Sequence, residues 1–136
     1  MKMKIQFETS DVNQEIAEYI LRRQNEPGSF CHLCPQDREG IIKELERLFA
    51  KPDPRVLVMR DDLGMLQGVF NLFIIPEEHY IETDWGFVTT PSVYDDLISH
   101  LHSTYSVCWM RWSQNPIRQC LMLTERTVWC IRKSRF

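Results

Sequence analysis

The sequence contains no long apolar run. No stretch of its 136 residues approaches the roughly 20 apolar residues that a membrane-spanning helix needs. Its first 12 residues contain neither the apolar stretch nor the small-residue cleavage site of a secretory signal peptide. We therefore expect one globular domain over residues 1–136, located in the cytoplasm, with no membrane partner.

Cysteines are few and odd in number. Five cysteines in a chain without a recognisable signal peptide argue against a disulfide framework. Cys31 and Cys34 form a C-x-x-C, but no second pair of ligands follows to complete a four-ligand zinc site. A redox or metal role for this pair is an alternative. We interpret the two cysteines as part of a loop and predict no metal site.

Basic residues are fewer than acidic residues, and the formal net charge is −3. Six basic residues and one acid lie between residues 105 and 136, so this segment alone is basic. A basic segment can bind nucleic acid. The acidic balance of the whole chain argues against a nucleic-acid partner.

The spacing of apolar residues predicts alternating strands and helices. Strands are predicted over residues 4–8, 55–60, 67–75, 80–89, 105–112 and 128–131. Helices are predicted after Asp11, after Pro35, after Thr90 and over residues 115–124. Short links predict that the second, third and fourth strands form an antiparallel meander. A helix between the fourth and fifth strands makes that pair parallel. The fold class is therefore α/β or α+β, with a mixed, mostly antiparallel sheet and helices on both faces.

Two helix starts carry capping signals. Ser10 and Asp11 are predicted to cap the first helix, with Gln14 in the capping-box position. Thr90 and Pro91 are predicted to be the N-cap and the first residue of the third helix. Ser92 with Asp95 is an alternative capping pair for that helix.

The order of elements resembles that of the GNAT-type N-acetyltransferases, an acyl-CoA N-acyltransferase-like family, of which this chain would be a divergent member. The segment RVLVMRDDLGMLQGVFNLFII, residues 55–75, carries much of the likeness. In it a hydrophobic strand, an acidic turn and a G-x-hydrophobic run follow one another. Residues 105–123 are similar to the acyl-carrier half of the family.

The resemblance implies transfer of an acetyl group from acetyl-CoA to the amine of a small molecule or peptide. It implies that the strands at residues 80–89 and 105–112 splay apart and that the pantetheine arm pairs with Phe87, Val88 and Thr89. It implies a pyrophosphate site on the loop and helix start that follow. The residues implied there are Thr89, Thr90, Ser92, Val93 and Tyr94, with Asn115 as a further contact to the carrier arm.

Glu82 and Asp84 are the candidate catalytic residues. They alternate along the fourth strand, and a two-residue period places Ile81, Trp85 and Phe87 on its other face. The resemblance implies that an acid here removes the proton of the attacking amine. The alternative is that both acids line a solvated face. The family's frequent tyrosine acid is absent between residues 115 and 124.

The junction DWGFVTTPSVYDDLI, residues 84–98, departs from the family's glycine- and arginine-containing loop. It has no glycine at the turn and no lysine or arginine, and Asp95 and Asp96 are expected to bring negative charge towards the first helical turn. An alternative function is therefore a non-catalytic binding or regulatory domain that has lost the CoA pyrophosphate loop. Family members commonly carry one more strand, which a partner chain of a homodimer could supply.

Overall fold

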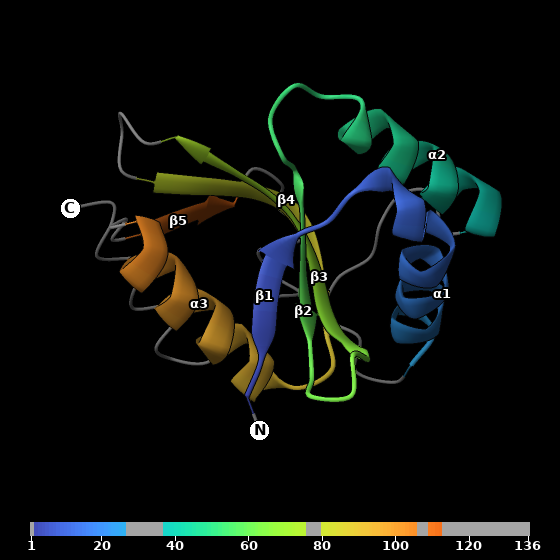
Figure 1. The fold of residues 1–136 in the computed structure, drawn as a ribbon. Coiled ribbons are helices and arrows are strands. Elements are labelled where there is room, and N and C mark those ends of the chain that lie inside the picture. Colours follow the sequence, from blue (N-terminus) through green and yellow to red (C-terminus); the bar gives the residue numbers. More distant parts are fainter. Residues whose placement is uncertain (1, 27–36, 76–79, 106–108, 113–136) are drawn as a thin grey trace.

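The described part of the sheet has five strands, in the order of the chain. The computed structural model describes residues 2–26, 37–75, 80–105 and 109–112. The strands run β1-β2-β3-β4-β5 across the sheet (Figure 1), and their bounds are Lys4–Phe7, Val56–Arg60, Leu66–Ile75, Tyr80–Val88 and Trp109–Trp112.

Among the described strands, only the last pair is parallel. The first four strands pair with antiparallel registers, and β4 pairs with β5 in parallel. Short links account for the antiparallel pairs β2–β3 and β3–β4, and the helix that joins β4 to β5 accounts for the parallel pair. The predicted mixed, mostly antiparallel sheet is confirmed.

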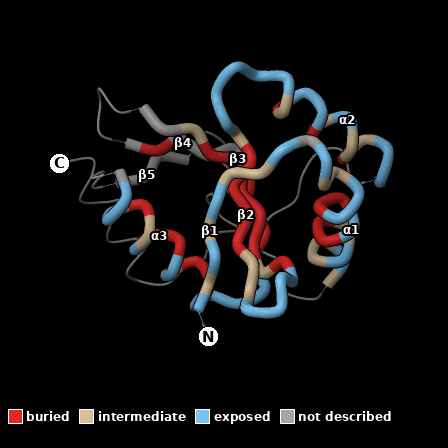
Figure 2. The backbone as a smooth tube through the Cα atoms, viewed as in Figure 1, coloured by how far each residue is buried: buried red, intermediate tan, exposed pale blue. Residues whose placement is uncertain are grey.

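Helices cover both faces of the sheet, as predicted. The helices α1 (Asn13–Gln24) and α2 (Arg38–Phe49) lie on one side, and α3 (Pro91–Tyr105) lies on the other (Figure 1). Each helix buries one apolar stripe, for example Ile16 and Ile20 in α1 or Leu97 and Leu101 in α3. The strand β2 is buried along Val56–Met59, and the buried residues concentrate in the central strands (Figure 2). The core is therefore a three-layer sandwich of helices, sheet and helix.

The predicted start of the first helix is wrong. A short 3-10 turn, Ser10–Val12, precedes α1, and no side chain caps either element. The second helix does have a side-chain cap, because the Asp37 carboxylate accepts a hydrogen bond of 2.9 Å from the Gly40 N–H.

The predicted strand over residues 105–112 is too long at its start. Tyr105 is the last residue of α3, and β5 begins at Trp109. The aromatic and β-branched composition near Tyr105 favours a strand locally, but the helix that begins at Pro91 continues one turn beyond Leu101. Its intrahelical hydrogen bonds decide the conformation. The predicted helix over residues 115–124 and the strand over residues 128–131 lie outside the described residues.

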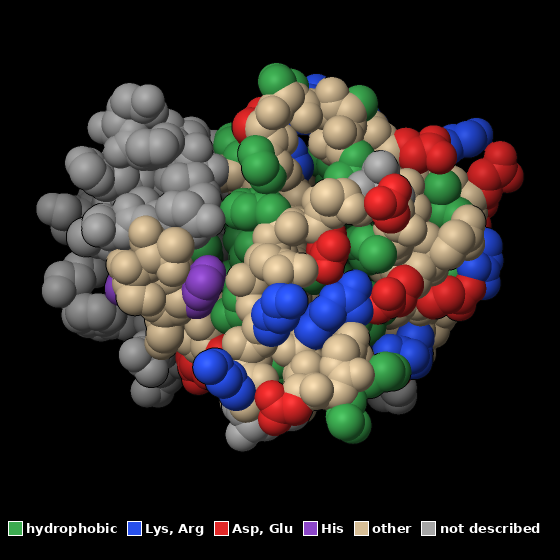
Figure 3. All heavy atoms as spheres, viewed as in Figure 1, with side chains coloured by type: hydrophobic (Ala, Val, Ile, Leu, Met, Phe, Trp, Pro, Cys, Tyr) green, Lys and Arg blue, Asp and Glu red, His purple; other side chains and the backbone are tan. Residues whose placement is uncertain are grey.

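Within the described residues, no helix is long and apolar enough to span a membrane. On the side shown in Figure 3, basic and acidic side chains lie next to one another over the described surface and form no large patch of one sign.

Candidate active site

The described pairing of β4 with β5 covers the first half of β4. Residues 80–83 of β4 pair with Trp109–Trp112 of β5, and Trp112 is the last residue that the structure describes. Beyond Thr83, β4 keeps β3 on one side, but among the described residues it has no strand on the other. Alternate backbone N–H and C=O groups of residues 85–88 are directed towards this edge. An extended ligand with amide groups could pair with them as an added strand does.

A bulge in β4 follows its last described pair with β5. Asn71 of β3 lies opposite Trp85, whereas the next residue, Leu72, lies opposite Thr83. Asp84 is therefore an extra residue that β3 does not match. A β-bulge bends its strand and increases the local twist.

The bulge changes the predicted alternation of β4. Trp85 and Phe87 share a face, and their ring centroids are 6.0 Å apart. The prediction that Ile81 shares this face is wrong, because the extra residue between Thr83 and Trp85 shifts the two-residue period by one.

The candidate bases lie at the bulge and two residues before it. Glu82 is opposite Phe73 in β3 and Arg111 in β5, and Asp84 is the bulged residue. Both acids thus lie on β4 at the end of its described pairing with β5. Their role as bases stays a prediction.

The residues predicted to hold the carrier arm come after the bulge, at the end of β4. Phe87 and Val88 are buried at 2% and 3% exposure, so they offer a ligand their backbone rather than their side chains. Thr89 is exposed, and its N–H donates a 3.0 Å hydrogen bond to the Gln67 carbonyl. The β3 side of β4 is therefore occupied to its end, and the β5 side is the side that can receive a ligand.

The start of α3 presents two hydroxyl groups. The side chains of Thr90 and Ser92 are exposed and their oxygens are 2.9 Å apart, and the Val93 N–H donates a 3.2 Å bond to the Thr90 carbonyl. Helix N-termini carry unsatisfied N–H groups and a partial positive charge, which favour anions. The helix begins at Pro91, as predicted.

The expectation that Asp95 and Asp96 approach the first turn is wrong. No acidic residue lies in the first turn of α3. Because the helix begins at Pro91, both aspartates fall in its second turn, further from an anion at the N-terminus.

Tyr94 fixes α3 against the sheet. Its side chain is fully buried, and its ring lies 5.4 Å from that of Phe70, centroid to centroid. Gly86 makes this possible, because a Cβ atom at that position would lie 2.1 Å from the Phe70 ring. Val93 is also buried. Any contact of Val93 or Tyr94 with a ligand at the helix start would therefore come from the backbone. Asn115 lies outside the described residues, as do Cys31 and Cys34.

A tyrosine of α1 contacts the end of β4. The Tyr19 hydroxyl and the Thr89 hydroxyl oxygen are 3.2 Å apart and share a hydrogen bond. Burial raises the pKa of Tyr19 above 10.0, although the hydrogen bond to Thr89 and the nearby Arg23 and Arg22 act in the opposite direction. Tyr19 therefore carries a proton at neutral pH.

A pocket of about 420 Å³ lies beside this contact. Arg22, Arg23 and Glu26 line it from the C-terminal end of α1, and Thr89 lines it from the end of β4. The opposite wall is the turn between β2 and β3 with the start of β3, namely Asp61, Met65, Leu66 and Gln67. Sequence reasoning missed this pocket, since its arginines lie more than 60 residues before Thr89 in the chain.

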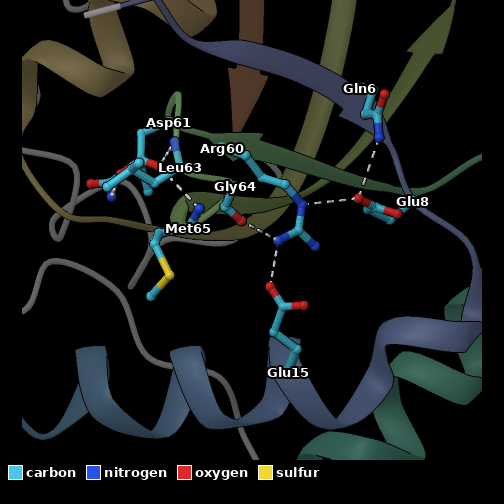
Figure 4. Close-up of polar contacts among 9 residues, drawn as sticks. Gln6, Glu8, Glu15, Arg60, Asp61, Leu63, Gly64 and Met65 are labelled. Atoms are coloured by element: carbon cyan, nitrogen blue, oxygen red, sulfur yellow. Dashed lines mark hydrogen bonds and ion pairs between the residues drawn. The ribbon is translucent and has the colours of Figure 1, made fainter.

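The turn between β2 and β3 is held by a network of polar contacts (Figure 4). The Asp61 carboxylate accepts hydrogen bonds from the N–H groups of Leu63 (2.9 Å) and Met65 (3.0 Å) and from the Gln67 amide (3.0 Å). Gly64 has a φ of 80°, which favours glycine at that position. The turn is thus a defined wall of the pocket.

Arg60 connects this turn to β1 and α1. Its guanidinium pairs with the carboxylates of Glu8 and Glu15 and donates to the Gly64 carbonyl (Figure 4). The Arg60 and Glu8 side chains are 15% and 12% exposed. An ion pair this far from solvent restricts how the groups can move, because breaking it would leave a charge uncompensated. The network therefore holds α1 and the turn in one arrangement on either side of the pocket.

The comparisons with known proteins identify the fold. The sequence matches no protein-family model and no curated protein. Its structure is similar to a ribosomal-protein-alanine N-acetyltransferase from Brucella melitensis, with a TM-score of 0.58 and 14% identity, covering 93% of this chain and 90% of that one. It is similar to a spermidine N-acetyltransferase from Vibrio cholerae, with a TM-score of 0.56 and 9% identity, covering 91% and 78%.

A third similar structure carries the acyl donor. It is a GNAT superfamily phosphinothricin acetyltransferase from Sinorhizobium meliloti in complex with AcCoA, with a TM-score of 0.52 and 13% identity, covering 82% of this chain and 65% of that one. The chain therefore has the GNAT N-acetyltransferase fold that the resemblance implied. Identities this low show the fold and leave the activity to be argued from the site.

The raised pKa of Tyr19 predicts a stability change at high pH. A pKa above the unfolded value gives stability that is fully present below pH 10 and is lost as the pH rises through the folded pKa. As the pH rises above about 10, the free energy of unfolding of the wild type should therefore fall more steeply than that of Tyr19→Phe. The difference in slope should be at most about 1.4 kcal/mol per pH unit for one proton. Urea unfolding at several pH values measures this difference, and parallel curves would show that Tyr19 titrates normally.

Proposed function

We propose that this protein is an N-acetyltransferase that moves an acetyl group from acetyl-CoA to an amine. The observation that carries the proposal is the edge of β4 beyond Thr83, which has no second partner strand among residues 2–26, 37–75, 80–105 and 109–112. A substrate with an extended amide-containing arm needs such an edge, and the fold is that of the GNAT N-acetyltransferases.

The carrier arm would lie along residues 85–88 of β4. Its amide groups would take the backbone bonds that β5 does not take there, as in strand addition. Because Phe87 and Val88 are buried, backbone pairing is the contact they can offer. The pyrophosphate would then meet Thr89, Thr90 and Ser92, where hydroxyl groups and the start of α3 can donate hydrogen bonds.

The thioester would lie near the bulge. The amine nitrogen would attack the carbonyl carbon, the C–S bond would break, and the thiolate would leave and take up a proton. Glu82 or Asp84 would accept the proton of the amine, directly or through a water.

The acceptor class is an amine of a small molecule or peptide. The similar structures include proteins named for spermidine, for ribosomal-protein alanine and for phosphinothricin. These names define a practical panel: a polyamine, a peptide with an N-terminal alanine and an amino acid. The protein is proposed to act in the cytoplasm and to form a homodimer, for which light scattering is the direct measurement.

Acetyl-CoA should raise the melting temperature of the protein. A ligand at a hundred times its dissociation constant stabilises the folded state by about 2.7 kcal/mol. Ser92→Glu places a negative charge at the start of α3 and should abolish most of this shift by repelling the pyrophosphate. Thr104→Glu is the matched control, because Thr104 is exposed near the opposite end of the same helix. Absence of any shift for the wild type at millimolar acetyl-CoA would instead favour the non-catalytic binding domain.

Replacing the base should slow acetyl transfer and leave acetyl-CoA binding intact. Glu82→Gln and Asp84→Asn are each compared with the wild type by following thiol release from acetyl-CoA with the amine panel. Loss of a general base costs about 100- to 10,000-fold in rate. The loss should shrink at high pH, where the amine is already deprotonated. If both variants retain full kcat with an amine that the wild type acetylates, neither acid is the base.

A further inference from the structure

We propose that the pocket beside Thr89 binds a phosphoryl group of the acyl carrier and that Arg22 of α1 supplies its positive charge. The proposal rests on the proposed function. It assigns to a side chain from a distant part of the chain the charge that the connection between β4 and α3 lacks. The ligand class is a phosphoryl group attached to an extended acyl carrier.

The pocket lies at the end of β4 that is remote from the candidate bases. Thr89 lines it, and the five residue steps from Asp84 to Thr89 span roughly 16 Å of extended strand. A group bound there is far from an amine that reacts at the bulge. The pocket therefore suits the non-reacting end of a carrier whose arm runs along β4.

Three of the four charged side chains that line the pocket are already compensated. The Arg23 guanidinium forms an ion pair with the Glu26 carboxylate. The Asp61 carboxylate accepts three hydrogen bonds from its own turn. The formal charges of the four side chains sum to zero, so the net charge of the lining would not select a ligand. Selection would depend on the side chain that has no ion-pair partner among the described residues.

Arg22 is that group. It is exposed, and it forms no ion pair with the residues that the structure describes. Its guanidinium carbon lies 5.5 Å from the centre of the Tyr19 ring, within the range of a cation–π contact. A guanidinium can donate two parallel hydrogen bonds to a phosphoryl group, which suits it to this ligand.

Tyr19 links this cation to the end of β4. Its ring supports Arg22 on one side, and its hydroxyl shares a hydrogen bond with Thr89. Tyr19 is 2% exposed, so its ring is held by packing. Arg22 and the Thr89 hydroxyl are therefore positioned around the same pocket by one buried side chain, and Tyr19 is a positioning residue.

Isothermal titration of acetyl-CoA into the full chain tests the proposal. Arg22→Gln should weaken binding about tenfold or more, since one charge-assisted contact is lost. Arg22→Lys should restore part of the affinity, because it keeps the charge but not the paired donors. Lys43→Gln is the matched control. It removes one positive charge from an α2 side chain that is 72% exposed and does not line the pocket.

A second titration separates the phosphoryl group from the rest of the carrier. Acetyl-pantetheine has the arm and the thioester but no phosphate, so Arg22→Gln and the wild type should bind it equally. The affinity for acetyl-CoA should also fall less with added salt in Arg22→Gln than in the wild type, because an exposed charge contact is screened by salt.

Three results would overturn the proposal. Equal acetyl-CoA affinity in Arg22→Gln and Lys43→Gln, with binding by the wild type, would remove the role of Arg22 and leave the proposed function standing. An increase in the acceptor KM of Arg22→Gln with unchanged acetyl-CoA affinity would assign the pocket to the acceptor. No binding of acetyl-CoA by the wild type would overturn both this proposal and the proposed function.

Discussion

The proposed chemistry depends on β4 and β5 separating beyond Thr83. A sheet that paired along its whole length would bury the backbone groups of β4 in hydrogen bonds and leave none for a ligand. One extra residue, Asp84, interrupts the register with β3 directly after the last described pair of β4 with β5. In the proposed site the carrier lies on the edge of β4 that follows this bulge, and the two acidic residues lie where that edge begins.

Contacts from both faces of the sheet hold the end of β4 in place. Gly86 allows the Phe70 ring to pack against β4, and Tyr94 then packs on Phe70 and holds the start of α3. On the other face, Tyr19 ties α1 to Thr89, and Arg60 ties α1 and β1 to the turn between β2 and β3. The end of β4 is thus fixed from both faces of the sheet. A preorganised site of this kind avoids the cost of ordering its groups when a ligand binds.

Much of the fold could be predicted from the sequence, and the site could be predicted only in part. Continuous apolar runs and short turns predict β2, β3 and β4, and the spacing of Tyr94, Leu97, Ile98 and Leu101 predicts α3. The bulge at Asp84 carries no glycine or proline to mark it, so the sequence predicts an uninterrupted alternation there. Local propensity favours a strand at Tyr105, although the helix α3 continues to this residue. The pocket with Arg22 depends on a tertiary contact between α1 and the end of β4, which no local pattern encodes.

Hydrogen exchange of the backbone amides with and without acetyl-CoA tests the central claim most directly. The account predicts that amides of residues 85–88 that face away from β3 exchange readily in the free protein and become protected when acetyl-CoA is added. Amides between β1 and β2 should be unchanged by the ligand. Full protection of residues 85–88 in the free protein, or no change on adding acetyl-CoA, would contradict the claim that this edge of β4 receives the carrier.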